Sequence, residues 1–259
     1  SKRLSHLLLS ICKSSVIPNE IIIVGTSNKD FENLDNFLNV LNIKLKISKK
    51  ADQVYQRNLG FKSITSNYVL QSDDDIKFTE NCIEILFNEI TKRTNTILCP
   101  LIIDDNGRRA DIRTINHYNN NYFLRLIFSF LNNFKEVKGG SLLNSGRPVP
   151  DITENNNREW LNSSLCFSIN SFNSYEYFDN KGKAFYEDVF TSHNFFMKGY
   201  KLLKIDSAKI IHGVKPPLSF NEHIQSLTNQ YKIVNKFKKY KILFLFDVVI
   251  FSIVFLIYK

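Results

Sequence analysis

Short apolar runs alternate with amphipathic helical patterns along this chain. The clearest run, IIIV at residues 21–24, lies between Pro18 and Gly25 and has the β-branched composition of a buried strand. Further strands are expected at residues 43–47, 68–70, 96–103, 160–169, 202–205 and 209–211, and helices at residues 4–11, 31–41, 51–59, 82–90, 122–134 and 188–197. This order predicts an α/β fold, a mostly parallel sheet with helices on both faces.

Polar residues follow two of the expected strands at the point where each strand ends. Gly25-Thr26-Ser27 follows the first strand, and Asp73-Asp74-Asp75 follows the strand at residues 68–70. Ligands of open α/β sheets bind beyond the carboxyl ends of the strands. The sequence therefore predicts a ligand-binding cleft that both segments border.

The acidic triplet itself restricts what surrounds it. Three adjacent carboxylates cannot all be buried without partners, because each repels its neighbours and loses hydration. They are tolerable in water or on a divalent cation, and magnesium and manganese prefer oxygen ligands. The alternative is an acidic turn that precedes the helix expected to begin near Thr79, since acidic residues suit helix N-termini.

The composition indicates a globular protein with an anionic partner other than nucleic acid. With 259 residues, 43% hydrophobic and 23% charged, the chain is long enough for one large or two small globular domains. Its net charge of +9 suits an anionic partner, either an acidic lipid or a phosphorylated substrate. It has no arginine-rich tract and no zinc-finger spacing, so nucleic acid is not expected. Four dispersed cysteines without a C-x-x-C pair indicate free thiols in a reducing cytosol.

The C-terminal segment differs from the rest of the chain. Lysines at positions 232, 236, 238, 239 and 241 precede Ile242–Tyr258, which is apolar except for Asp247 and Ser252. Spanning a bilayer takes about 20 apolar residues, so this segment is at the short limit. Basic residues before an apolar run favour attachment to the cytoplasmic face of the cell membrane, with the helix either spanning the bilayer or lying on it. A helix buried in the protein core is the alternative.

Several short segments, taken in order, resemble those of a known family. They are SI at 10–11 with IPNEIIIV at 17–24, QRNLG at 56–60, NYVLQSDDD at 67–75, WLNSS at 160–164, YEDV at 186–189 and AKIIH at 208–212. Together they resemble the family 2 glycosyltransferases of bacterial cell-surface polysaccharides, which have the GT-A fold. The resemblance implies a glycosyltransferase domain at 1–215, with a nucleotide-sugar-binding half at 1–105 and an acceptor-side half at 106–215. Residues 216–259 would form a basic linker and a hydrophobic, membrane-associating helix.

The resemblance also implies a donor site. Asp73, Asp74 and Asp75 match the family's D-x-D region, which implies a divalent metal (Mn or Mg) on the donor diphosphate. We expect Asp75 on the metal and Asp73 or Asp74 on the sugar side. His212 matches a late histidine that completes the metal site in some members. Arg57 would neutralise the diphosphate or contact the base, and Thr26 and Ser27 would hydrogen-bond the donor.

On the acceptor side, Asp188 matches the catalytic base of inverting members. It would deprotonate an acceptor hydroxyl, which then attacks the anomeric carbon. Glu187 matches a position near the acceptor, and its alternative is an acid that merely begins a helix. Trp160 would form part of the acceptor wall, because flat aromatic faces suit sugar C–H surfaces, or else pack in the core.

The chain departs from the family pattern in two places. Members usually begin with a strand before the helix that opens this chain, so a central strand is expected to be missing. A carboxylate usually ends the second strand, where this chain has Gly25-Thr26-Ser27.

Three functional hypotheses compete. The leading one is an inverting, metal-dependent transfer of a sugar from a nucleotide-sugar to a glycan or lipid-linked acceptor. A nucleotidyltransferase would need a glycine-rich phosphate loop, and none follows Val24. A catalytically degenerate, membrane-tethered module that binds glycans or nucleotides is the non-enzymatic alternative.

Overall fold

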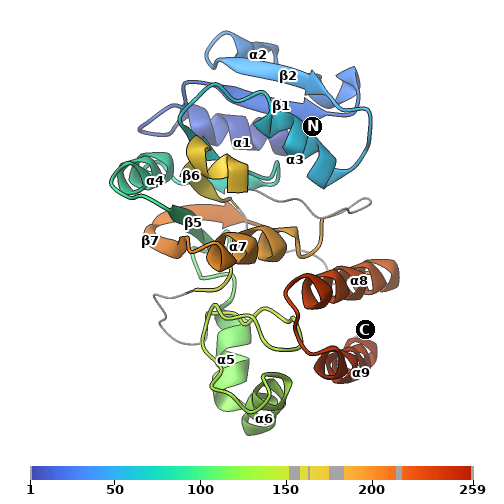
Figure 1. The fold of residues 1–259 in the computed structure, drawn as a ribbon. Coiled ribbons are helices and arrows are strands. Elements are labelled where there is room, and N and C mark those ends of the chain that lie inside the picture. The colour runs from blue at the N-terminus through green and yellow to red at the C-terminus, as the bar shows by residue number, and fades with distance from the viewer. Residues whose placement is uncertain (1, 152–157, 163, 175–183, 214–217, 258–259) are drawn as a thin grey trace.

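The computed structural model describes residues 2–151, 158–162, 164–174, 184–213 and 218–257 (Figure 1). Its strands form two sheets. The smaller sheet is a parallel pair, β1 (Ile21–Gly25) and β2 (Ile43–Ile47), with Ile21 opposite Ile43. It lies at one end of the molecule, beside α1 (Lys2–Cys12). Both strands match the sequence prediction, although β1 is only half-buried.

The larger sheet has five strands in the order β3-β6-β5-β7-β4. Their bounds are β3 Tyr68–Leu70, β6 Cys166–Ser168, β5 Thr96–Ile103, β7 Lys201–His212 and β4 Ile76–Phe78. Within this sheet only β5 and β7 run parallel; the pairs β3–β6, β5–β6 and β4–β7 are antiparallel.

The sheet is therefore mixed, and the expectation of a mostly parallel sheet was wrong. Strands β4 and β6 have only three residues each, which is too short for an apolar period to be recognised. The predicted strand at residues 160–169 shrinks to β6. The two strands expected at residues 202–205 and 209–211 are one strand, β7, which bulges opposite Pro100 and Leu101.

Helices cover the sheets and close the core between them. They are α3 (Gln53–Phe61), α4 (Cys82–Thr91) and α7 (Glu187–Met197), with the short η1 (Asn28–Phe31), α2 (Asp35–Leu38) and η2 (Ile169–Ser174). The main core joins the buried stripe Leu4, Leu7, Leu8 and Ile11 of α1 to α4 and β4. The helix expected at residues 31–41 is interrupted, because Asn33 has a φ of 65° in the left-handed region.

The far end of the molecule is helical. It holds α5 (Ile112–Asn120), α6 (Tyr122–Leu131), α8 (Phe220–Lys236) and α9 (Lys241–Ile257) (Figure 1). Helix α8 lies where a basic linker was expected, and it begins with a capping box in which Ser219 and Glu222 bond each other's backbone N–H. No helix in the described part of the chain has the length and apolar character needed to cross a membrane.

Asp247 fixes α9 to the rest of the protein. Its carboxylate is fully buried and accepts both Arg147 Nε–H, at 3.0 and 2.9 Å, and the Ser145 hydroxyl, at 2.8 Å. The Arg147 guanidinium also stacks on Phe251, 3.4 Å from the ring centroid. The one acid of this apolar helix therefore points inward, at the loop of residues 139–150.

Glu20 connects the smaller sheet to the turn that precedes β3. Its carboxylate accepts hydrogen bonds from the Lys44 ammonium at 2.6 Å, Thr65 N–H at 2.8 Å and Ser66 N–H at 2.9 Å. Desolvation raises the pKa of Glu20, but the hydrogen bonds outweigh it and lower the pKa to about 2.

Glu20→Gln is expected to lower the urea midpoint of unfolding at neutral pH, because an amide lacks the charge that these donors stabilise. The carboxylate contributes its full stability above pH 4.5, the reference value, and loses it as the pH falls towards its folded pKa of about 2. The midpoint difference between wild type and variant should shrink through that window. Glu32→Gln, at an exposed acid nearby, is the control and should leave the midpoint unchanged. A difference that grew on acidification would contradict the assignment.

Candidate active site

A cleft of about 1800 Å³ runs between the two sheets. It is bordered by β1, β3, α1, α3 and the first residues of α7. The acidic triplet and Asp188, 113 positions or more apart in the chain, both line it. Thr26, Arg57, Glu187 and His212 line the same cleft, whereas Ser27 and Trp160 lie outside its wall.

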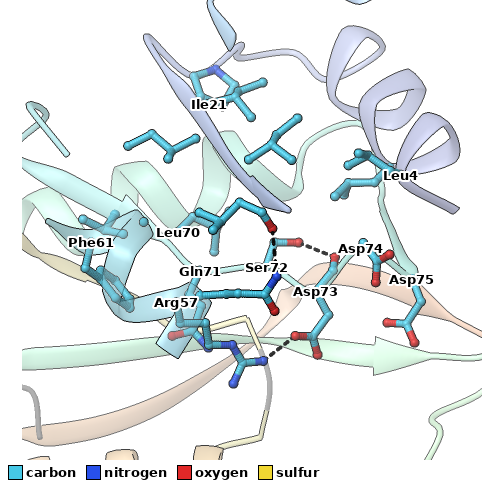
Figure 2. Close-up of a pocket in the computed structure, with 18 of the residues that line it drawn as sticks. Leu4, Ile21, Arg57, Phe61, Leu70, Gln71, Ser72, Asp73, Asp74 and Asp75 are labelled. Atoms are coloured by element: carbon cyan, nitrogen blue, oxygen red, sulfur yellow. Dashed lines mark hydrogen bonds and ion pairs between the residues drawn. The ribbon is translucent and has the colours of Figure 1, made fainter. Parts of the chain in front are cut away.

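The part of the cleft between β1 and β3 is apolar. Among the described strands, β1 pairs only with β2 and β3 only with β6, so each leaves one edge without a strand partner. Side chains of β1, β3 and α1 line this space (Figure 2). Thr26 and the acidic triplet lie where β1 and β3 end, which is the arrangement predicted from the sequence. Glu20, Thr65 and Ser66 line the opposite end, where the two strands begin.

Arg57 is the centre of an ion-pair network at the end of the cleft that holds the acidic triplet. Its guanidinium pairs with Asp73 on one side, as Figure 2 shows, and with Glu187 on the other. The Arg57 side chain is 14% exposed and that of Glu187 only 1%. Because a buried carboxylate needs a partner, Arg57 and Glu187 hold each other in place. Arg57 thereby connects α3, the acidic turn and α7.

Helix α7 begins where the network ends. Tyr186, at its N-cap, has a φ of 63°, and Glu187 and Asp188 form the first turn. Glu187 points inward and accepts a further hydrogen bond from the Thr191 hydroxyl at 3.1 Å. Asp188 is half-buried, and its Oδ1 accepts its neighbour Val189 N–H at 2.9 Å. The helix therefore directs Glu187 to Arg57 and leaves Asp188 on the wall of the cleft.

Gln53, which is not among the predicted site residues, joins two walls of the cleft. Its side-chain carbonyl accepts Ala184 N–H at 3.1 Å, and its amide donates to Asp73 Oδ1 at 3.4 Å. It lies in the first turn of α3, one turn before Arg57. Their spacing of four residues, which places both side chains on one helix face, was the signal in the sequence.

Asp75 and His212 are brought together by strand register. Ile76 pairs with His212 across β4 and β7, so the preceding Asp75 lies beside the histidine, with Asp75 Oδ1 3.5 Å from His212 Nε2. His212 Nδ1 lies 2.8 Å from the Gly213 carbonyl, which can only accept. In the neutral Nδ1–H tautomer, Nε2 is an acceptor that faces a carboxylate. Either a proton on Nε2 or a cation between the two atoms would satisfy both.

In the described residues, no group of three or more His, Cys, Asp or Glu side chains could hold a metal ion. Asp75 and His212 make two. This number still suits magnesium or manganese, which commonly take one or two protein ligands and complete their coordination with phosphate oxygens and water.

Asp74 is the most exposed member of the triplet. Desolvation, followed by repulsion from Asp75 and Asp73, raises its pKa above the usual range. Repulsion of this kind would be relieved by a cation bound at the turn. The three acids thus have different surroundings: Asp73 pairs with Arg57, Asp75 lies beside His212, and Asp74 is exposed.

Thr26 and Ser27 form a tight turn around Asp30. The Asp30 carboxylate accepts Thr26 N–H at 2.6 Å, the Thr26 hydroxyl at 2.9 Å and Ser27 N–H at 3.1 Å. The Thr26 N–H bond, the largest of these contributions, and the other two lower the pKa of Asp30. Asp30 also lines the cleft, so a carboxylate does stand near the end of β1. The pattern Ser27-x-x-Asp30, a capping box, was its sequence signal.

Trp160 packs away from the cleft. Its indole N–H donates to the Val149 carbonyl at 3.1 Å, and its ring joins the cluster around Leu142, Val189 and Phe190. Trp160 thereby packs against the first turn of α7, in agreement with the core-packing alternative.

The fold is that of known glycosyltransferases. GalNAc-T7, solved with UDP, GalNAc and Mn²⁺, superimposes with a TM-score of 0.60 at 14% identity, over 90% of this chain and 45% of that one. S. aureus TarS 1–349 in complex with UDP-GlcNAc has a TM-score of 0.56 at 16% identity, over 90% of this chain and 61% of that one. Both have the GT-A fold. The chain thus spans less than two thirds of the length of either.

No curated protein matched the sequence. The family model described as glycosyl transferase family 2 does match it, over residues 1–146, which is more than half of the chain. This matched segment contains α1, both strands of the smaller sheet, Arg57 and the acidic triplet. The chain belongs to glycosyl transferase family 2.

Proposed function

We propose that this protein transfers a sugar from a nucleotide-sugar donor to a hydroxyl of a glycan or lipid-linked acceptor, with inversion at the anomeric carbon. The observation that carries the proposal is the single cleft that Asp188 and the Asp73–Asp75 turn share. The solved structures with UDP and GalNAc, and with UDP-GlcNAc, support a nucleotide-sugar as the donor.

Asp75 and His212 are the residues that would hold a manganese or magnesium ion. Their 3.5 Å separation and the His212 tautomer suit a shared cation, and GalNAc-T7 was solved with Mn²⁺. When bound, the ion would neutralise charge on the diphosphate leaving group. Asp73, Asp74 and Thr26 line the same end of the cleft and would orient the donor, with Arg57 holding Asp73 in place.

Asp188 is the proposed general base. Its carboxylate would accept the proton of the acceptor hydroxyl as the hydroxyl oxygen forms its bond to the anomeric carbon. The bond from that carbon to the diphosphate oxygen breaks in the same step, and attack opposite the leaving group inverts the configuration. Glu187 acts indirectly in this scheme, because its ion pair with Arg57 fixes the start of α7.

A panel of nucleotide-sugars tests the proposal. One donor is expected to raise the melting temperature in the presence of Mn²⁺, and the same donor should be turned over. Chelation with EDTA should abolish turnover, and Mn²⁺ should restore it. Asp75→Asn should raise the Mn²⁺ concentration needed for half-maximal turnover by about tenfold or more.

Asp105→Asn, at an exposed acid of the turn after β5, is the matched control for Asp75→Asn and should behave as wild type. Anomer analysis of the product by NMR reports inversion. A protein that binds a donor but turns over none would support the binding-module alternative. Turnover that is insensitive to EDTA would contradict the metal assignment.

A further inference from the structure

Helices α6 and α9 lie at the end of the molecule opposite the smaller sheet (Figure 1), and each exposes a stripe of large apolar side chains. On α9 these are Ile242 (58% exposed), Leu245 (56%), Phe246 (47%), Val249 (57%), Ile253 (53%) and Leu256 (66%). Their spacing of three and four residues places them on one face of the helix. On and just after α6 they are Tyr122 (68%), Phe123 (71%), Leu126 (46%) and Phe134 (75%).

The two stripes are continuous. The ring of Phe130, on α6, lies 5.2 Å from that of Phe246 and 5.9 Å from that of Phe134. Phe128 and Phe251 pack against each other beneath them, with ring centroids 6.2 Å apart. We call this surface the α6–α9 face. Monomeric soluble proteins rarely expose contiguous apolar areas of this kind unless the surface binds something.

Basic side chains predominate around the α6–α9 face. Arg125 and Lys135 are exposed on and after α6, and Lys238 and Lys241 are exposed at the turn between α8 and α9. From Lys232 to Lys259 the only acid is Asp247, and its carboxylate is buried against Arg147. The surface thus combines outward apolar side chains with a basic rim.

Contacts on the buried side of α9 fix the orientation of the α6–α9 face. The ion pair of Asp247 with Arg147 anchors the opposite side of α9, and Leu243 and Phe244 are buried there. The helix cannot turn its stripe inward without breaking that pair. Its exposed side chains are therefore presented as a preformed surface.

We propose that the α6–α9 face binds the surface of an anionic lipid bilayer, with both helices lying in the plane of the interface. Apolar side chains would enter the boundary between headgroups and acyl chains, while arginine and lysine pair with lipid phosphates. The four exposed basic side chains outnumber the one exposed acid that the described residues place near the face, Glu136, which pairs with Lys138. This excess of positive charge beside an apolar surface favours an anionic bilayer over a protein partner. This binding is independent of the proposed sugar transfer and needs no donor.

Vesicle flotation with the 259-residue chain tests the proposal. Wild type should float with vesicles of phosphatidylglycerol and phosphatidylcholine, and much less with pure phosphatidylcholine. Leu245→Glu/Val249→Glu should weaken binding by about tenfold or more, because two acids would enter the interface. Lys238→Glu/Lys241→Glu should weaken it by a similar factor and reduce its salt dependence, since each basic residue contributes about fivefold at an anionic surface.

The control is Val40→Glu/Met197→Glu, at side chains 63% and 61% exposed that lie outside the face. It should bind as wild type, and circular dichroism should show all variants folded. Wild type that fails to float with anionic vesicles would overturn the proposal, as would equal binding by Leu245→Glu/Val249→Glu. So would a lipid-free dimer that this variant converts to monomer, because the face would then be an interface between two copies.

Discussion

Asp188→Asn is expected to lower kcat by about 10²- to 10⁴-fold, because an amide cannot accept the proton of the acceptor hydroxyl. Donor binding should be unchanged. The amide has the shape of the carboxylate, and its oxygen can still accept Val189 N–H, now 2.9 Å from Asp188 Oδ1. The measurements are turnover at saturating donor and the melting-temperature rise that the donor and Mn²⁺ produce.

Asp105→Asn is the control here as well, since it removes one exposed acid without touching the cleft. Glu187→Gln provides the contrast. It should lower both stability and turnover, because it weakens the buried pair with Arg57. If Asp188→Asn kept wild-type turnover, the base would have to be another group and the proposed mechanism would fail. If it lost donor binding instead, Asp188 would belong to the donor site.

Asp247→Ala is expected to cost about 3–5 kcal/mol of stability, because it leaves the Arg147 guanidinium without the carboxylate that faces it. Arg147 is 19% exposed and Asp247 fully buried, so water can replace little of the lost interaction. Urea unfolding followed by circular dichroism measures the loss. Hydrogen exchange should locate it in α9, which the pair anchors.

The double variant Asp247→Ala/Arg147→Met tests whether the loss of stability comes from the Arg147 charge that is left without a partner. It should be more stable than Asp247→Ala alone, because no charge remains without a partner. Ile253→Ala, on the exposed side of the same helix, should change stability by less than about 0.5 kcal/mol. A loss below about 1 kcal/mol in Asp247→Ala would contradict the burial of this pair.

The longer secondary-structure elements were predictable from local pattern. Strand β5 matches its predicted bounds of 96–103, and α1, β1, β2 and β3 lie where apolar periodicity places them. The pattern failed where elements are short or packing intervened. Strand β4 has three residues directly after the acidic triplet, and its pairing with β7 depends on a segment more than 130 positions away. Helix α8 was missed although its Ser219-x-x-Glu222 capping box is visible in the sequence.

The sequence predicted which residues line the candidate site better than it predicted which of them contact one another. The acidic triplet, Arg57, Glu187, Asp188 and His212 were all identified from the sequence, and all line one cleft. Their partners were not. Arg57 was expected to face a diphosphate, and the structure pairs it with Asp73 and Glu187. Gln53 and Asp30 were overlooked, because each acts through a hydrogen bond that polarity alone does not reveal.

Apolar periodicity, which is a local property, predicted an α/β chain with an acidic turn after a strand. The order of short segments supplied the resemblance to the family 2 glycosyltransferases, and the family model confirms it. Long-range packing decided the rest. The mixed sheet, the contact of Asp75 with His212 and the inward turn of Asp247 all arise between segments that are far apart in the chain, from 68 positions for Leu98 and Cys166 to 137 for Asp75 and His212. Such contacts leave no periodic signal in the chain, because they depend on which strand edges pair and on which buried charges find a partner.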